Sequence, residues 1–434
     1  MNPDLQFLTK NGVSRRSFLR TLGAAGAAAA ALPAMAYGHA QQQQLASNTT
    51  VPAAGRRGFG SDMGEMRVLP PDAVIISSNE NPLGPAQVAL DAICTTAALG
   101  GRYHREEEMN TVKVFTDSFG LPQASRDHPG FVALFPGSGG PLDLALMSNI
   151  GPDKPLVFGD PSYEQGPRAA EAMKAGKFPV PLTADYKHDV KEMVAAHPSP
   201  GAYYIVNPNN PTGTMTPRED IVWLLENKPK GSVVIVDEAY FHFSNDESVI
   251  PLVLKYPDLI VTRTFSKIYG MAGLRAGVAV AHPERLQAFS TVAPPARSVG
   301  SISITSAAAA RVSLLDKDLV PTRRKINADV REETLAFLTK NGYKVIPGSQ
   351  ANFFMVDVGR DGHTFGADMF AEKVVIGRTW PALPTYVRVT VGTAPEMQKF
   401  QTAFVKCMDK TPSPTLSSEL YLPEFHAPSE LHRA

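Results

Sequence analysis

Short apolar runs alternate with amphipathic stretches between residues 72 and 280 of this chain. Each apolar run spans four to six residues, which predicts strands that are buried on both faces of a sheet. The alternation of such strands with helical patterns favours an α/β fold with a mostly parallel central sheet flanked by helices. The predicted strands are Val132–Phe135, Pro155–Phe158, Ala202–Val206, Val233–Val236 and Leu259–Thr264.

The pattern changes after residue 301. A helical pattern extends over Ser301–Lys340 with an interruption near Pro321, and strand-like runs follow at Tyr343–Val358 and Tyr386–Val391. This order indicates a smaller α+β domain that closes over the first. From Thr411 onward the chain is rich in Pro, Ser and Glu, which predicts an extended arm or a disordered tail.

Composition narrows the class of protein. The chain has 434 residues, of which 43% are hydrophobic and 19% charged, as is typical of a soluble globular protein. Because 42 basic residues balance 42 acidic ones, no overall field attracts nucleic acid or an anionic membrane, and we expect a small-molecule partner. Cys94, Cys407 and His242 have no partners at metal-ligand spacing, so we expect no metal site, two buried thiols and a peripheral histidine.

The first forty residues carry an export pattern. The segment Ser14–Arg20, with Arg15 and Arg16 adjacent, precedes an uncharged stretch rich in Ala, Gly and Leu at Thr21–Ala36. This resembles a bacterial twin-arginine signal, with small residues suitable for cleavage at 34–36 or 38–40. A chance Arg-Arg pair before an Ala-rich helix is the alternative. Because the apolar run is short for a membrane span, we expect export by the twin-arginine machinery to the periplasm or beyond, without a stable membrane anchor.

Three polar motifs directly follow predicted strands: Asn209–Gly213, Asp237–Tyr240 and Thr264–Lys267. Ligands of open α/β sheets bind at the carboxyl ends of the strands, so we expect the three motifs to share one site. Together they offer the Lys267 amine, the Asp237 carboxyl, and several hydroxyl and amide donors. Pyridoxal 5'-phosphate needs these groups, because its aldehyde takes an amine, its pyridine nitrogen an acid, and its phenolic oxygen donors.

A glycine turn supplies the remaining requirement, a phosphate site. Gly137–Gly140 follows the first predicted strand and opens a helical pattern at Leu142–Met147, and a helix N-terminus suits an anion. Residues of the lysine segment converge on the same phosphate, with Arg275 as its cation. The predicted phosphate-binding residues are Ser138, Gly139, Thr264, Ser266 and Arg275.

This ordered set of motifs resembles the class I/II aminotransferases of PLP fold type I, and within them the histidinol-phosphate aminotransferase branch. The resemblance covers about Ile75–Lys406 and also includes Asn79–Pro85 and Val387–Gly392. The chain departs from that branch at Ser138–Gly140, where an Ala-Asp-Glu type of run is usual.

The resemblance implies a role for each cofactor-binding residue. Lys267 would bond the aldehyde and afterwards move a proton at the substrate Cα, and Asp237 would pair with the pyridine nitrogen. Tyr240 and Asn210 would donate to the phenolic oxygen, and Tyr163 would stack on the ring. Without the resemblance, an aspartate at a strand end is commonly a helix cap, and a lone tyrosine is commonly part of a core.

The resemblance also implies the substrate contacts and a dimer. Arg388 would grip the substrate carboxylate, for which its planar fork is suited, although a strand arginine can also form a surface ion pair. Asn81–Gly84 would form a mobile lip over the substrate, in which Gly84 would contact the substrate. Asn352 would add a polar contact near the substrate carboxylate. Tyr103 would reach the phosphate of a neighbouring subunit, which requires a homodimer with shared sites.

We therefore expect six segments in the chain. They are a signal segment (1–40), a linker or N-terminal arm (41–72), a segment contributing to the small domain and the lip (73–104), a large PLP-binding domain (105–300), a bridging helix with the C-terminal small domain (301–410), and a tail (411–434).

The expected activity is a two-stage transfer of an amino group from an amino acid to a 2-oxo acid, with pyridoxal phosphate as carrier. Within the same fold the alternative is a lyase, cyclase, racemase or decarboxylase, and from another class an exported binding protein without turnover. A dinucleotide dehydrogenase is disfavoured because no glycine fingerprint is followed by an acidic residue at the expected distance. Histidine synthesis is expected in the cytoplasm, so an exported enzyme favours an aromatic or specialised amino donor over histidinol phosphate.

Overall fold

The computed structural model describes residues 72–125, 130–292 and 302–409. All of them belong to one compact unit, Met66–Ala434. The predicted signal segment, the linker up to residue 71 and the tail from residue 411 lie outside the described residues.

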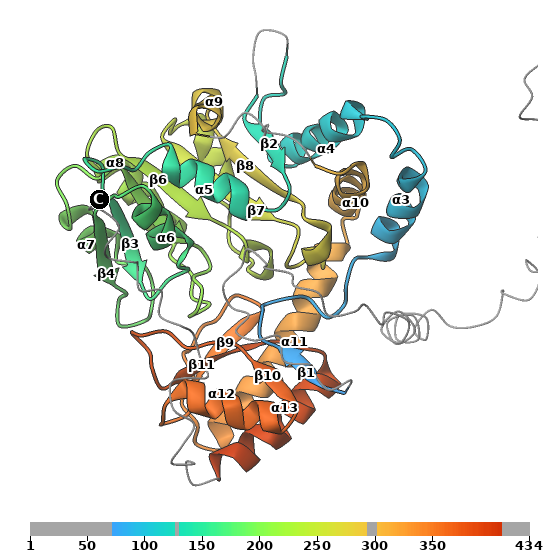
Figure 1. The fold of residues 1–434 in the computed structure, drawn as a ribbon, viewed down its shortest axis with the longest axis vertical. Coiled ribbons are helices and arrows are strands. Elements are labelled where there is room, and N and C mark those ends of the chain that lie inside the picture. The colour runs from blue at the N-terminus through green and yellow to red at the C-terminus, as the bar shows by residue number, and fades with distance from the viewer. Residues whose placement is uncertain (1–71, 126–129, 293–301, 410–434) are drawn as a thin grey trace, which may run out of the picture. The chain divides into compact units, whose positions relative to one another are not determined.

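A seven-stranded sheet forms the centre of the larger part of the described chain, in the order β2-β8-β7-β6-β5-β3-β4 (Figure 1). Only β8 runs antiparallel to its neighbours, β2 and β7, so the other strands share one direction. We call this sheet with its flanking helices the large domain. Its strands are β2 Val132–Phe135, β3 Leu156–Asp160, β4 Lys177–Pro181, β5 Ala202–Val206, β6 Val233–Asp237, β7 Leu259–Thr264 and β8 Gly277–Ala281.

Helices cover both faces of the sheet, because successive strand residues point to opposite sides. Tyr203 and Ile205 pack with α4, α7, α8 and α10, whereas Tyr204 and Val206 pack with α5, α6 and α9. The helices are α3 Gln87–Ala97, α4 Arg105–Ser118, α5 Gly139–Met147, α6 Gln165–Ala172, α7 Val190–Ala195, α8 Arg218–Asn227, α9 Pro283–Val292 and α10 Ile304–Leu315, with short 3₁₀ turns η3 Phe241–Phe243, η4 Ile250–Leu254 and η5 Ala272–Leu274.

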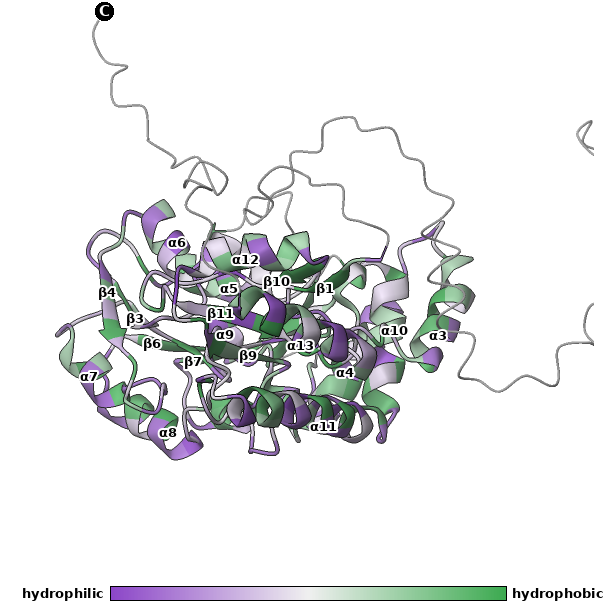
Figure 2. Cartoon of the chain, turned by 90° about the horizontal axis from the view of Figure 1, so that it is seen from below, coloured by the Kyte–Doolittle hydropathy of each residue, from purple (hydrophilic) through white to green (hydrophobic). Residues whose placement is uncertain are grey.

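A second core holds the small domain, in which the N-terminal strand β1 lies beside elements from the other end of the chain (Figure 1). Strand β1 pairs in parallel with β10, and β9 pairs antiparallel with β11. Helix α11 carries both hydrophilic and hydrophobic residues along its length (Figure 2) and supplies Leu338 to this core. The elements are β1 Val74–Ile76, α11 Leu319–Lys340, β9 Phe353–Asp357, α12 Gly362–Ala371, β10 Val374–Ile376, β11 Tyr386–Thr390 and α13 Ala394–Met408.

The five strands predicted in the large domain are confirmed, each with bounds that match or shift by up to two residues. The predicted helical break near Pro321 lies slightly earlier, between Leu315 and Leu319. Pro321 itself is in the first turn of α11, where a missing N–H costs no helical hydrogen bond. The prediction of two buried thiols is wrong for Cys94, which is exposed on α3, whereas Cys407 is buried, and no disulfide joins the two.

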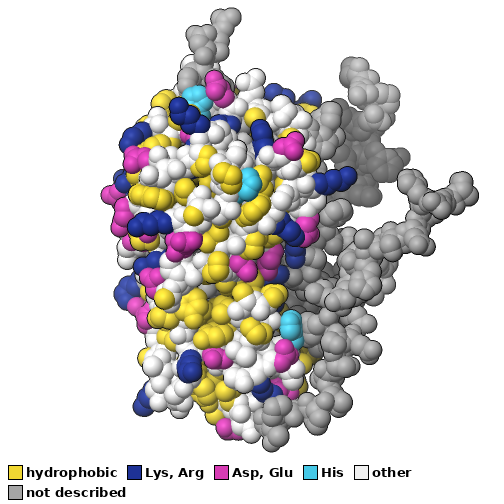
Figure 3. All heavy atoms as spheres, turned by 90° about the vertical axis from the view of Figure 1, so that its left-hand side faces the viewer, with side chains coloured by type: hydrophobic (Ala, Val, Ile, Leu, Met, Phe, Trp, Pro, Cys, Tyr) yellow, Lys and Arg dark blue, Asp and Glu magenta, His cyan; other side chains and the backbone are white. Residues whose placement is uncertain are grey.

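The surface on the side shown in Figure 3 mixes basic and acidic side chains with apolar ones, and neither sign of charge gathers into a large field there. No helix within the described ranges is long and apolar enough to cross a membrane.

Candidate active site

Three neighbouring strands carry the predicted site residues at their carboxyl ends. In the sheet order β7-β6-β5, Lys267 follows β7, Asp237 ends β6, and Asn210 follows β5. Because the three strands are parallel, these ends lie on one edge of the sheet.

Asp237 is held rigidly at that edge. Its side chain is almost fully buried, and Oδ1 accepts hydrogen bonds from the Ala239 amide and the Thr262 hydroxyl, both at 3.1 Å. Burial raises the pKa of Asp237 to about 6, and the nearby Lys267 charge opposes the rise. A protonated ring nitrogen beside this carboxyl would favour its ionised form.

Lys267 is half-buried next to Tyr240. Its Nζ donates to the Ser78 carbonyl at 3.3 Å and lies 5.3 Å from the centre of the Tyr240 ring. Burial lowers the pKa of Lys267 to about 8, and the Arg388 charge lowers it further. A substantial fraction of this amine is therefore neutral near physiological pH, which a nucleophilic lysine requires.

Tyr240 is positioned by a residue that the sequence did not single out. Asn79 donates from Nδ2 to the Tyr240 hydroxyl at 3.0 Å, and its backbone N–H and Oδ1 both contact the Thr390 hydroxyl. Asn79 is buried and has φ of 53°, a left-handed conformation that asparagine tolerates better than most residues. An asparagine at the start of the lip motif was the only signal that could have identified it.

Arg388 is buried on β11 and held by neutral groups. Nη1 donates to Asn210 Oδ1 at 2.8 Å and Nη2 to the Ser77 carbonyl at 2.7 Å. Its guanidinium also lies over the rings of Trp380 and Phe353, at 5.2 and 5.7 Å from their centres. Because Asn210 uses its oxygen for Arg388, its amide nitrogen is the group left to donate to a ligand.

The predicted phosphate residues form a cradle. The Thr264 hydroxyl donates to Ser266 Oγ at 2.9 Å, and exposed Arg275 contacts the same oxygen at 3.4 Å from Nη1. A Cβ on Gly137 would lie 2.2 Å from Arg275 Nη2, and a Cβ on Gly277 would lie 2.4 Å from the Gly137 carbonyl carbon. Ser138 and Gly139 open helix α5 beside it, so the cradle offers a cation, hydroxyls and helix N–H groups.

A second arginine lies beside Tyr163. Arg378 forms an ion pair with Glu164 and stacks on Trp380, 4.7 Å from the ring centre. The Trp380 indole N–H donates to the Ser162 carbonyl at 3.3 Å, which fixes this aromatic wall. Burial raises the pKa of Tyr163 to about 12, with further contributions from Tyr240 and Asp237 that place it near them. Sequence reasoning missed Glu164, Arg378 and Trp380, because only the fold brings them together.

The lip contacts the segment that follows Lys267. Asn81 Nδ2 donates to the Ile268 carbonyl at 3.0 Å, and a Cβ on Gly270 would lie 2.0 Å from the Gly84 oxygen. Asn352 Nδ2 donates to the carbonyls of Asn79 and Glu80, both at 3.1 Å. The Asn352 amide nitrogen thus contacts the backbone directly before the lip, and its contact near the substrate carboxylate stays a prediction.

Tyr103 stands apart from the other predicted residues, because its side chain is fully exposed on the surface between α3 and α4.

The residues that converge fit pyridoxal phosphate. A buried acid, a partly neutral amine, a phenol and an arginine-lined glycine cradle match the ring nitrogen, aldehyde, phenolic oxygen and phosphate. The cradle is the most specific observation, since Gly137 and Gly277 leave no room for a side chain where Arg275 and the start of α5 meet.

Comparison with known proteins agrees with this geometry. The family model for aminotransferase class I and II matches residues 71–404. The chain is 35% identical over 335 residues to histidinol-phosphate aminotransferase 1 of Nitrosococcus oceani, which covers 76% of this chain and 87% of that protein. It is 32% identical over 315 residues to an aromatic amino acid aminotransferase of Cutibacterium acnes, which covers 71% of this chain and 86% of that protein.

The fold is also found in a solved structure, that of histidinol-phosphate aminotransferase from Sinorhizobium meliloti in complex with pyridoxal-5'-phosphate. The TM-score is 0.68 at 24% identity, and the match covers 77% of this chain and 90% of that chain.

Proposed function

Since the chain belongs to the class I and II aminotransferases, which use pyridoxal phosphate, we propose that its amino donor is an aromatic amino acid and that it works as an exported homodimer. Transamination is the activity of the family. The donor, the assembly and the export route are the proposal.

The cofactor, when bound, supplies the carbonyl that carries the amino group and a ring that withdraws electrons from the substrate Cα. Lys267 would provide the amine for that carbonyl and, once released, would hold or move the proton at Cα. Asp237 would keep a proton on the ring nitrogen, and Tyr240 and Asn210 would donate to the phenolic oxygen. Tyr163 would pack on the ring, and the residues that would hold the phosphate are Ser138, Gly139, Thr264, Ser266 and Arg275.

Arg388 orients the donor through its carboxylate. Its guanidinium is fixed by Asn210, by the Ser77 carbonyl and by two aromatic faces, so little reorganisation is needed when a carboxylate arrives. This preorganisation favours an amino acid as donor.

The proposal of an aromatic donor is carried by the Arg378–Glu164 ion pair beside Trp380. Glu164 already balances the Arg378 charge. The surface formed by Trp380 and this ion pair is therefore aromatic and has no net positive charge that could bind a second anionic group on the donor. A named relative at 32% identity is an aromatic amino acid aminotransferase, which supports the same choice. Histidinol phosphate, named in another relative, carries an anionic group that this wall does not favour.

A donor panel tests the activity and the donor together. The purified mature protein is mixed with phenylalanine, tyrosine, aspartate or histidinol phosphate while the visible spectrum reports pyridoxamine phosphate and an assay reports the oxo product. We expect the aromatic donors to give both signals with the highest kcat/KM. A preference for histidinol phosphate or aspartate would contradict the proposed donor, and no cofactor band after reconstitution would contradict the site.

A charge substitution sharpens that test. Glu164→Gln leaves Arg378 without its carboxylate, so the ratio of kcat/KM for aspartate to that for phenylalanine should rise about tenfold. Glu171→Gln is the control and should leave the ratio unchanged, because Glu171 lies on helix α6, which Glu164 precedes as the N-cap, but pairs with Lys177 on the surface.

The exposed Tyr103 supports the homodimer, since its side chain is accessible to a partner subunit. Light scattering should give twice the chain mass. In each mixed dimer of a Lys267→Ala chain with a Tyr103→Ala chain, one of the two shared sites is intact. Because about half of the dimers in a random equal mixture are mixed, the mixture should recover up to about a quarter of wild-type turnover. A monomer with full activity would overturn the shared site.

Export rests on Arg15 and Arg16, which precede the apolar run. Replacing both with lysine should retain the protein inside the cytoplasm with an uncleaved N-terminus. Equal periplasmic recovery of the wild-type and variant proteins would exclude the twin-arginine route.

A further inference from the structure

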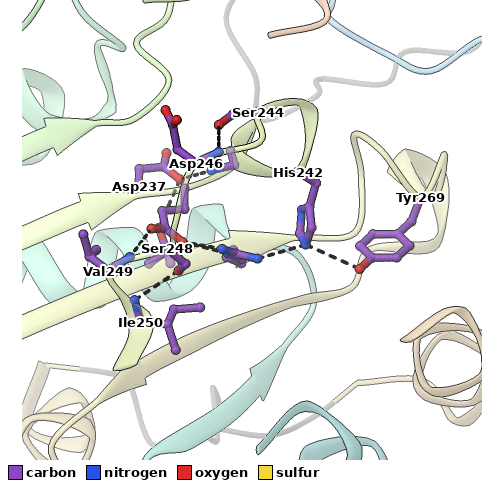
Figure 4. Close-up of polar contacts among 12 residues, drawn as sticks. Asp237, His242, Ser244, Asp246, Ser248, Val249, Ile250 and Tyr269 are labelled. Carbon is purple, nitrogen blue, oxygen red and sulfur yellow. Dashed lines mark hydrogen bonds and ion pairs between the residues drawn. The ribbon is translucent and has the colours of Figure 1, made fainter. Parts of the chain in front are cut away.

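A buried ion pair lies directly behind the cofactor edge of the sheet. Glu238, fully buried, accepts from Arg263 Nε at 2.8 Å and from Nη2 at 2.7 Å. Glu238 also accepts from the Ser248 hydroxyl at 2.7 Å and the Val249 amide at 3.0 Å; Ser248 and Val249 are labelled in Figure 4. The carboxylate is therefore fully engaged, and its position is set by three separate groups.

This pair joins two strands that carry most of the site. In the register of β6 and β7, Asp237 lies opposite Thr262 and donors from Thr262 reach it on the cofactor side. Glu238 directly follows β6 and Arg263 is the next residue of β7, and these two side chains meet in the ion pair. The Asp237–Thr262 pair thus lies on the cofactor side, and the Glu238–Arg263 pair holds the same two chain segments together beside it.

A second link runs from Arg263 to the lysine segment. Arg263 Nη1 donates to His242 Nε2 at 3.0 Å, and the Tyr269 hydroxyl lies 3.4 Å from the same nitrogen, as Figure 4 shows for His242 and Tyr269. Tyr269 is two residues beyond Lys267, and His242 is two beyond Tyr240. The sequence suggested a peripheral histidine, but His242 is a half-buried link between the two segments that bear the amine and the phenol.

The arginine at the centre has little freedom to move. Its guanidinium lies between Phe119 and Phe241, at 5.1 and 4.8 Å from their ring centres. Burial and the charges of Arg263 and Arg324 hold the pKa of His242 well below its usual range, so the ring is neutral and its Nε2 accepts. The Glu238 oxygens, the three Arg263 side-chain nitrogens and His242 Nε2 therefore each have a partner of matching type.

We propose that Arg263, through Glu238 and His242, is a positioning residue that fixes Asp237 and Tyr240 relative to Lys267. This inference rests on the proposed roles of those three residues toward the cofactor. Arg263 touches neither substrate nor cofactor, and its effect is on the angle and distance at which the acid and the phenol meet the ring. A misplacement of about 1 Å at a reacting centre can cost on the order of a hundredfold in rate.

The test removes the charges without leaving one unpaired. Arg263→Met alone would leave a buried carboxylate and unfold the edge, so it is combined with Glu238→Gln, which keeps an acceptor for the Val249 amide. The reconstituted double variant is examined for cofactor dissociation constant, visible circular dichroism of the bound cofactor, and the pH midpoint of its visible band. We expect about tenfold weaker cofactor binding, an altered circular dichroism signal, a shifted midpoint and a kcat about a hundredfold lower, with KM nearly unchanged.

A matched control separates positioning from stability. Lys228 and Asp258 form another largely buried pair, at the opposite end of β7. Lys228→Met with Asp258→Asn should lower the melting temperature while leaving the circular dichroism and the pH midpoint as in the wild type. Equal changes in both double variants, or wild-type signals in the folded Arg263→Met/Glu238→Gln protein, would overturn the proposal.

Two further measurements complete the design. His242→Gln keeps an acceptor near Nε2 and should retain the wild-type circular dichroism, whereas His242→Phe should not; identical spectra for the two would overturn the His242 link. The wild-type and Lys267→Ala proteins are measured in parallel. If the wild type shows no bound-cofactor band, or if Lys267→Ala retains that band, the assignment of the cofactor site is wrong. Either result is distinct from a failure of the positioning role.

Discussion

The two halves of the site are built in different ways. The strand-end half, Asp237 with Lys267, is assembled within a short stretch of sequence and braced by the buried Arg263–Glu238 pair. The lip half, Asn79–Gly84 with Arg388, is held by hydrogen bonds to neutral acceptors between segments more than 300 residues apart. The groups for the chemistry thus lie at the ends of central strands, whereas the substrate contacts lie between segments from the large and the small domain.

Removing the amine should break the strand-end half completely. Lys267→Ala is expected to lower kcat by about ten-thousandfold or more, because it deletes both the nucleophile and the proton carrier at Cα. Thermal unfolding should show a folded protein, since the lysine is only half-buried. Retained transamination would show that another group performs these steps.

The same half should show a pH-dependent stability in the apoprotein. The pKa of Asp237 is raised from 3.8 to about 6 in the folded state, so the folded form binds the proton more tightly than the unfolded form. Its stabilising contribution, on the order of 3 kcal/mol, is complete below pH 4 and is lost as the pH rises through 6. The unfolding free energy of the wild type minus that of Asp237→Asn, measured by urea titration from pH 4 to 7, should fall with pH. A difference that rises instead would mean that Asp237 is ionised in the apo fold.

The lip half should respond mainly in substrate binding. Arg388→Lys keeps the charge but loses the planar fork and its fixed contacts, so kcat/KM for the amino donor should fall about a hundredfold. The visible spectrum of the bound cofactor should stay close to that of the wild type. A large change in the visible spectrum of Arg388→Lys with an unaltered KM would show that Arg388 acts on the cofactor, as the strand-end half does, and not on the substrate.

A smaller effect on KM is expected from Gly270, where the chain passes close to the lip. Gly270 has φ of 68° and a Cβ there would lie 2.0 Å from the Gly84 oxygen, so Gly270→Ala should displace the lip and raise KM about tenfold. Gly273→Ala is the matched control, since a Cβ there meets nothing within 4 Å. Similar KM values for the two variants would show that the lip tolerates the displacement.

The sequence predicted the strand-end half well for a physical reason. Strands such as β6 are apolar runs with high β propensity, and their motifs follow at once, so local patterns are sufficient. Strand β8, Gly277–Ala281, was missed because small residues give a weak strand pattern although all five are buried. Strand β4, Lys177–Pro181, was missed because it is a mostly exposed edge strand that contains prolines.

Contacts between side chains that lie far apart in the sequence could not be predicted in the same way. Asn79 meets Tyr240 across 161 residues, and Arg378 meets Glu164 across 214. No local pattern encodes such pairs, because their side chains are ordinary polar residues until the fold brings them together. For the same reason His242 was misjudged as peripheral, since its partners Arg263 and Tyr269 come from another strand and another loop.

The central claim is that Lys267 at the end of β7 is the residue that holds the cofactor. Borohydride reduction of the reconstituted protein, followed by peptide mapping with mass spectrometry, tests it directly. We expect one modified peptide, carrying the reduced cofactor on the Lys267 side chain. Modification of a different lysine, or of none while the visible band is present, would show that Lys267 does not hold the cofactor.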